Sequence, residues 1–176
     1  MKRSKFKLKR WLNRIFCLQA VDLHCGYLGG LILLAVAILI RLVSGSPYRV
    51  YFLLKNARFM PSLTFFSLMN LVLTVAMGFA CGLILSCRRR NLQCLKFQGG
   101  MLFVLLTVFW FITYPLVFRG CLLFAALLSL LAAWLLTLGC MLLFFRVQPL
   151  AGWISAVFLF WVTYLILVVL GGIFWI

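Results

Sequence analysis

Acidic side chains and histidine are almost absent from this sequence. Asp22 is the only acid and His24 the only histidine, against seventeen lysines and arginines. General acid–base catalysis needs groups that titrate near the working pH, and Zn, Fe or Mg sites need several His, Asp, Glu or Cys side chains at one point. We therefore expect neither a hydrolytic nor a metal-dependent enzyme, with no catalytic residue, metal or cofactor. A proton- or sodium-coupled pump is also disfavoured, because such pumps place an ionisable group at mid-membrane.

Metal-ligand spacing is also missing from the cysteines. The seven cysteines are an odd number and are scattered along the chain, so we interpret them as small apolar residues. Cys17 and Cys25 flank Asp22 and His24. A metal site or a lipid attachment near the first helix is the alternative that this cluster leaves open.

Polar residues of any kind are few. Of the 176 residues, 67% are hydrophobic and 10% are charged, whereas about half of a soluble domain is apolar. In lipid the backbone must satisfy its own hydrogen bonds, so long apolar runs without alternation form helices. The sequence predicts an all-α integral membrane protein, a five-transmembrane-helix bundle. The expected spans are 26–43, 61–85, 99–118, 121–145 and 150–175, with a basic loop over 87–97.

A basic segment, residues 1–25, precedes the membrane domain, which we assign to residues 26–176. Its apolar residues recur at helical three- and four-residue steps: Leu8, Trp11, Leu12, Ile15 and Phe16. Such an amphipathic tail suits the headgroup layer of a membrane with anionic lipid, and an ordinary positive flank that orients the first helix is the alternative. Nucleic acid is not an expected partner, because the basic run is short and adjoins a membrane anchor.

The distribution of cations predicts the orientation. With the N-terminus in the cytoplasm, the inside carries the seven cations of the tail, four in the second loop and Arg146, while five lie outside. Cytoplasmic loops carry the excess of Lys and Arg. We therefore expect a cytoplasmic N-terminus and an outer C-terminus. Together with the compact loops, this pattern suits a bacterial inner (plasma) membrane.

Residues at set intervals in the second and third spans resemble the TspO/translocator protein family, the tryptophan-rich sensory or peripheral benzodiazepine receptor-like proteins. The family's second helix opens with Pro-Pro and continues with Phe, Trp, Leu-Tyr and Met-Gly. The matching positions here are Pro61, Phe66, Asn70, Leu73, Thr74, Met77 and Gly78. The family's Trp and Tyr are replaced by Asn70 and Thr74. In the third helix, which in the family carries Asn, Trp and aromatics, this chain has Thr107, Trp110 and Tyr114.

The fifth span and the chain end extend the resemblance. The family has a small-residue pair followed by Pro-Tyr-Leu-x-Trp, and here Ala151 and Gly152 lead at the same distance into residues 157–161, which end on Trp161. The family's closing Asn is Val169 here, and residues 173–175 resemble its Ile-Trp end. The resemblance thus runs from about residue 26 to the C-terminus and identifies the chain as a divergent member.

The resemblance implies a pocket for a hydrophobic ligand among the five helices, with a tetrapyrrole such as a porphyrin, or a sterol-like lipid, as the ligand. The candidate ligand-binding residues are Phe66, Asn70, Thr74, Trp110, Ala125, Phe158, Trp161 and Leu165. The first loop would act as a lid through Tyr48, Lys55 and Arg58, whose cations can pair with ligand carboxylates. Asn70 is expected to face the bundle, where it either bonds across helices or contacts ligand.

Three functions remain as alternatives. The first is a non-enzymatic receptor or transport-facilitating protein for such a ligand. The second is a small basic membrane subunit that acts as a structural or assembly partner of a larger complex. The third, suggested for the family, is photochemical degradation of a bound tetrapyrrole through tryptophan. The expected partners are membrane lipid, a small hydrophobic ligand and a second copy of the chain, packed through small residues such as Gly171 and Gly172.

Overall fold

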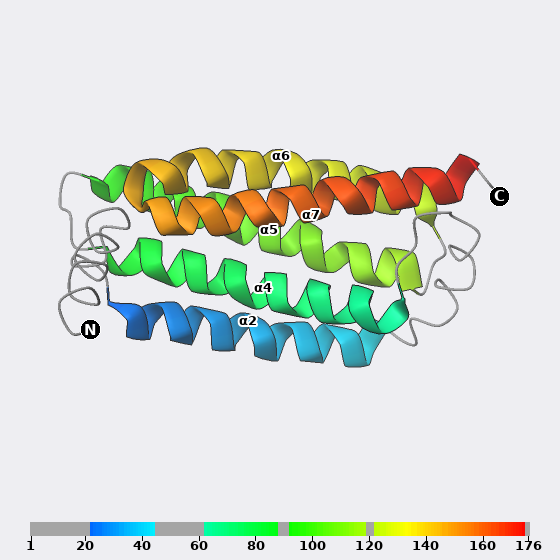
Figure 1. The fold of residues 1–176 in the computed structure, drawn as a ribbon, viewed down its shortest axis with the longest axis horizontal. Helices are drawn as coiled ribbons and strands as arrows, with labels where there is room; N and C mark the ends of the chain where they lie inside the picture. Colours follow the sequence, from blue (N-terminus) through cyan, green and yellow to red (C-terminus); the bar gives the residue numbers. More distant parts are fainter. Residues whose placement is uncertain (1–21, 45–61, 88–91, 119–121, 175–176) are drawn as a thin grey trace, which may run out of the picture.

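Five long helices make up the fold. The computed structural model describes residues 22–44, 62–87, 92–118 and 122–174, and Figure 1 shows the helices running along one common axis. They are α2 (Leu23–Ser44), α4 (Leu63–Ser86), α5 (Gln93–Phe118), α6 (Leu123–Val147) and α7 (Pro149–Phe174). All five are long and apolar enough to cross a membrane. The predicted all-α integral membrane protein with five spanning helices is confirmed.

One predicted boundary is wrong. The sequence predicts a basic loop over 87–97, but α5 already begins at Gln93. Gln, Leu and Lys are good helix formers, and Gly99 and Gly100 lower helix propensity without ending the helix. At the tight turn between α6 and α7, Pro149 is the first residue of α7. Its missing N–H costs no helical hydrogen bond at that position. Residues 1–21, which hold most of the predicted tail, lie outside the described part.

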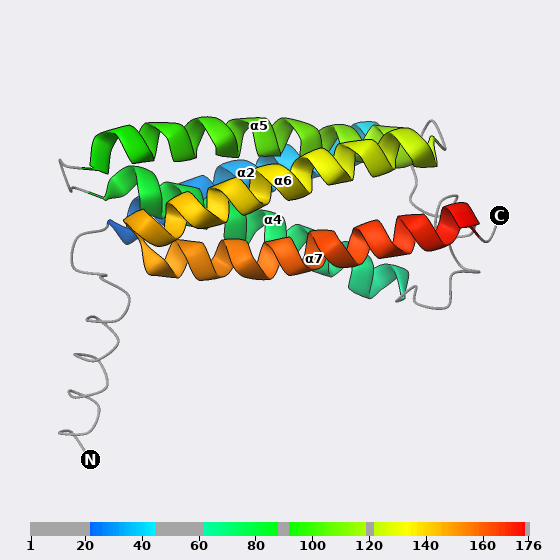
Figure 2. The ribbon, with the colours of Figure 1, turned by 90° about the horizontal axis from the view of Figure 1, so that it is seen from above.

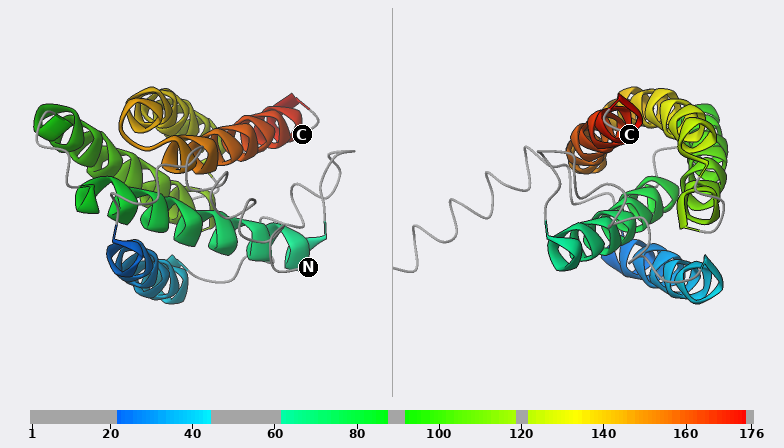
Figure 3. Two further views of the ribbon diagram at one scale, coloured as in Figure 1. Left: turned by 60° about the vertical axis from the view of Figure 1, so that its left-hand side comes forward. Right: turned by 90° about the vertical axis from the view of Figure 1, so that its right-hand side faces the viewer.

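The helices form a pair and a three-helix layer. α2 packs mainly on α4, whereas α6 packs on both α5 and α7, and α4 joins the two groups through contacts with α7 and α5. Figure 2 shows this arrangement from above, and the right panel of Figure 3 shows it from one end. In the most apolar stretch of α4, 56% of the residues are buried, whereas in that of α2 17% are buried. α4 is therefore the central helix, and α2 presents most of its surface to lipid.

Glycines bring α2 and α4 into backbone contact. A Cβ atom at Gly82 would meet the carbonyl oxygen of Cys25, lie 2.8 Å from its carbonyl carbon, and lie 2.8 Å from the Cα of Gly26. A Cβ at Gly78 would lie 2.5 Å from the carbonyl oxygen of Gly29. Small residues of this kind let membrane helices approach closely and gain van der Waals contact.

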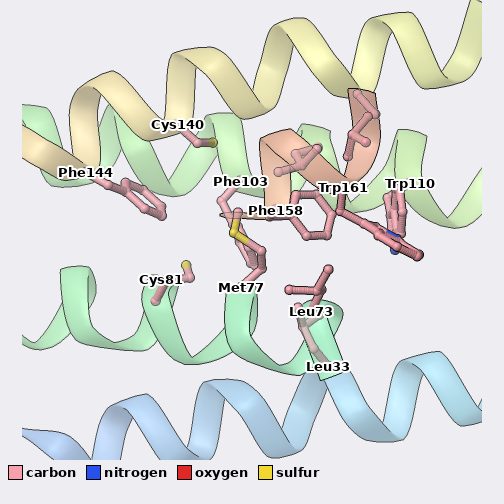
Figure 4. Close-up of a cluster of buried hydrophobic side chains, with 14 of the residues drawn as sticks. Leu33, Leu73, Met77, Cys81, Phe103, Trp110, Cys140, Phe144, Phe158 and Trp161 are labelled. Carbon is pink, nitrogen blue, oxygen red and sulfur yellow. The ribbon is translucent and has the colours of Figure 1, made fainter. Parts of the chain in front are cut away.

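The core lies between the pair and the layer (Figure 4). Met77 of α4, Phe103 of α5 and Phe158 of α7 are all buried there. Cys81 and Cys140 are buried in the same cluster, as expected for cysteines that serve as small apolar residues. Among the described residues, no three His, Cys, Asp or Glu side chains come together as a metal site would require.

Candidate functional site

Asn70 of α4 lies at the interface between α4 and α7. Its side chain is 5% exposed. Its Nδ2 donates to the carbonyl oxygen of Phe66 at 2.9 Å, and its Oδ1 accepts a hydrogen bond from Nε1 of Trp161 at 2.9 Å. The expectation that Asn70 faces the bundle is confirmed. Of the two roles considered, the structure shows the bond across helices, from α7 to α4.

Thr74 repeats this arrangement one turn further along α4. Its Oγ1 donates to the carbonyl oxygen of Asn70 at 2.7 Å and accepts a hydrogen bond from Nε1 of Trp110 at 3.1 Å. Residues four apart lie on the same helix face, so α4 offers two successive acceptors to indoles on two different helices. The two indole N–H groups join α4 to α5 and to α7.

The aromatic rings around these hydrogen bonds pack edge to face or tilted. Trp110 lies 4.9 Å from Phe158, and Trp161 lies 5.2 Å from Tyr164 and 6.2 Å from Phe66, between ring centroids. Trp110 and Trp161 are 4% and 7% exposed, and Figure 4 shows both within the core. Such pairs contribute about 0.5 to 1.5 kcal/mol each beyond area burial. Trp110 and Trp161 thus form part of an inner wall of the bundle and do not face lipid.

Two small cavities adjoin this wall. The first, here called the helix-end cavity, has a volume of about 40 Å³ and lies between the end of α2, the first half of α4 and the end of α5. The second, the tryptophan cavity, has a volume of about 60 Å³ and is lined by Trp110 and Leu165 among others. Both are lined by Phe66, Asn70 and Tyr114. These three side chains are therefore the wall between the cavities.

Most of the predicted ligand-binding residues meet at these cavities. Phe66, Asn70, Thr74, Trp110 and Leu165 line one or both. Phe158 lines a third, smaller space beside Trp110.

The remaining predicted positions do not line either cavity. Trp161 stands behind Asn70, to which it is bonded. Ala125 is half-buried on α6 and lines neither the helix-end nor the tryptophan cavity. The predicted lid residues Tyr48, Lys55 and Arg58 lie outside the described residues.

Arg41 and Tyr114 line these cavities, although neither is among the predicted ligand-binding residues. Arg41 is one of the five cations that the charge distribution places outside, and its side chain lines the helix-end cavity. Its Nη2 donates to Oγ of Ser67 on α4. Ser67 lies three residues before Asn70, and residues at this spacing share one helix face. This spacing was the signal in the sequence that could have placed Ser67 in the site beside Asn70. The pairing of α2 with α4, which brings Arg41 and Ser67 together, is not visible in a single sequence.

Replacing Thr74 with valine is expected to destabilise the protein by about 1 kcal/mol, because it removes the buried acceptor of the Trp110 N–H. The matched control is Thr137→Val. Thr137 is also buried and also donates to the carbonyl four residues earlier, at 2.7 Å, but no bond to it from another helix is found in the described part of the chain. Unfolding by SDS in mixed micelles would measure both. Equal losses of stability would contradict a role for the indole bond.

Comparison with protein families is consistent with this geometry. The sequence profile of the TspO/MBR family matches residues 30–175. No curated protein and no solved structure gives a significant match. The matched residues include all five helices except the first turns of α2, so the chain belongs to the TspO/MBR family.

Proposed function

We propose that this protein is a non-enzymatic membrane receptor or transport-facilitating protein that binds a small hydrophobic ligand between its helices. A tetrapyrrole such as a porphyrin, or a sterol-like lipid, is the proposed ligand. The observation that carries the proposal is the pair of adjoining cavities in a TspO/MBR bundle, lined by aromatic rings and by a few oriented polar groups. Ligand sites in proteins commonly combine an apolar lining with a few polar groups.

Binding of such a ligand requires movement of the shared wall. Sites for drug-sized molecules have volumes of about 300 to 1,000 Å³, far above the 40 and 60 Å³ of the two cavities. Phe66 and Tyr114 are only half-buried. Rotation of these rings would join the two spaces without breaking either indole hydrogen bond to α4.

A ligand titration of the purified protein in detergent tests the proposal. Protoporphyrin IX and cholesterol are the probes, and melting temperature and tryptophan fluorescence are the readouts. A ligand at a hundred times its Kd stabilises the folded state by about 2.7 kcal/mol, so a rise of several degrees and quenching of tryptophan emission are expected for at least one probe.

A matched pair on α7 separates the cavity from the lipid surface. Leu165 lines the tryptophan cavity, whereas Leu167 is 62% exposed. We expect Leu165→Phe to weaken binding by filling the cavity and Leu167→Phe to leave binding unchanged. An equal response of the two variants, or no response of the wild type to either probe, would contradict the proposal.

One observation favours the alternative of a structural subunit. α2 leaves large apolar side chains such as Leu31, Leu42 and Val43 exposed at 60% or more, and a partner helix could cover this face as readily as lipid can. Stable co-purification of another membrane protein, together with a wild type that ignores both probes, would favour this function.

We further propose that the chain resides in a bacterial inner membrane with its N-terminus in the cytoplasm. The described cations support this orientation in part. Lys96 lies near the start of α5 and Arg146 near the end of α6, both at the end of the bundle where α2 begins, while Arg41 lies at the opposite end. For a proposed homodimer, Gly171 is the more available of the predicted glycines, because Gly172 is already buried within the chain.

A further inference from the structure

Arg41 is the one cation that lines the helix-end cavity among the residues that the structure describes. Arg41 is in the last turn of α2 and is exposed at the rim, and its Nη2 is bonded to Oγ of Ser67. Ser44, Ser67 and Asn70 add polar groups to the same lining, and the remaining lining is largely apolar or aromatic. A guanidinium has five N–H donors. The bond to Ser67 uses one of them and contributes no negative charge.

The chain has no acidic side chain that could neutralise Arg41. Asp22 is its only acid, and it precedes α2 at the opposite end of that helix. The two residues are nineteen positions apart in the sequence, which corresponds to about 28 Å along a helix at 1.5 Å per residue. A cation at the edge of an apolar region is costly unless an anion or water accompanies it. A ligand can supply that anion on the cavity side.

We propose that the helix-end cavity binds an amphipathic carboxylic acid, with its carboxylate on Arg41 and its apolar body between α2, α4 and α5. Guanidinium and carboxylate form two parallel charge-assisted hydrogen bonds, which give both affinity and orientation. Ile40 and Phe111 supply apolar lining in the same cavity as Arg41, and Phe66 lines both this cavity and the tryptophan cavity. The inference rests on the proposed function and names the ligand class of the same site.

The test compares 1-pyrenebutyric acid with its methyl ester, which has the same ring system without the charge. Energy transfer from tryptophan to pyrene, recorded in neutral detergent, reports binding of both probes. We expect the acid to bind more tightly than the ester, and Arg41→Gln to weaken acid binding by about tenfold or more, as loss of a hydrogen bond to a charged group implies. Ester binding to the same variant is expected to remain as in the wild type.

Two variants serve as controls. Arg146→Gln removes one positive charge in the last turn of α6, at the other end of the bundle, and is expected to leave acid binding unchanged. Arg41→Lys keeps the charge but not the planar fork, so intermediate acid binding is expected. Unchanged ester binding also verifies that Arg41→Gln is folded.

The outcomes are distinguishable. Equal binding of acid and ester, or equal weakening of both by Arg41→Gln, overturns the carboxylate site and leaves the hydrophobic pocket standing. Failure of both pyrene probes and of the porphyrin and sterol overturns the proposed function as well. If addition of phosphatidylglycerol to the micelles abolishes the difference between acid and ester, Arg41 serves a lipid phosphate and the proposal is also overturned.

Discussion

Replacing Gly82 with alanine is expected to destabilise the protein by about 1 to 3 kcal/mol, the usual cost of overpacking a tight interface. The added methyl group would overlap the carbonyl group of Cys25 and lie 2.8 Å from the Cα of Gly26. Both neighbours are backbone atoms of α2, which cannot turn away as a flexible side chain can. α2 and α4 must therefore separate along their whole crossing. Unfolding by SDS in mixed micelles would measure the change.

Gly100→Ala is the matched control for Gly82→Ala. A Cβ at Gly100 would meet only Cδ2 of Leu85, at 3.7 Å, which is an ordinary contact. Alanine is the better helix former by about 1 kcal/mol, so this variant is expected to be neutral or more stable than the wild type. If Gly82→Ala were as stable as Gly100→Ala, the backbone contact between α2 and α4 would be refuted.

The number and type of the helices could be predicted because lipid imposes one strong constraint. Each apolar run must satisfy its own backbone, so run length alone predicts a spanning helix. The start of α5 could not be predicted in this way. Residues 93–97 include the polar Gln93 and Lys96 and follow three arginines, which by hydropathy resembles a loop, yet α5 already includes them. Hydropathy reports which residues lipid tolerates, and helix ends extend beyond that region.

The candidate site could be predicted where the chemistry of a single side chain determines whether it faces the bundle or the lipid. An amide at mid-membrane is unfavourable in lipid, so Asn70 could be expected to face inward. Its partner could not be predicted, because the bond to Trp161 depends on the pairing of α4 with α7. The same reason explains Arg41. Its sequence position predicts a helix end, and only the packing of α2 on α4 brings it to Ser67 and the cavity.

Replacing Asn70 with leucine is expected to destabilise the protein by about 1 to 3 kcal/mol, the cost of leaving a buried donor without its acceptor. Leucine has the same branched skeleton as asparagine, with methyl groups in place of the amide oxygen and nitrogen, so the substitution removes the acceptor of the Trp161 N–H and keeps the branched shape. That indole is 7% exposed, so its N–H is largely shielded from solvent. A double-mutant cycle with Trp161→Phe isolates the pair, because phenylalanine keeps an aromatic ring and removes the donor.

The coupling energy between Asn70 and Trp161 decides what holds α7 to α4. Hydrogen bonds between membrane helices contribute about 0.6 kcal/mol on average and up to about 1.7, and a value in this range is expected from SDS unfolding of the four proteins. Thr163→Val with Trp134→Phe provides a reference cycle. That pair also joins an indole N–H to a hydroxyl between helices, at 2.9 Å, but on the exposed face of α6 and α7. A coupling energy of zero would contradict this expectation. It would mean that the hydrogen bond between Asn70 and Trp161 does not stabilise the packing of α7 on α4, and that packing of the side chains alone does so.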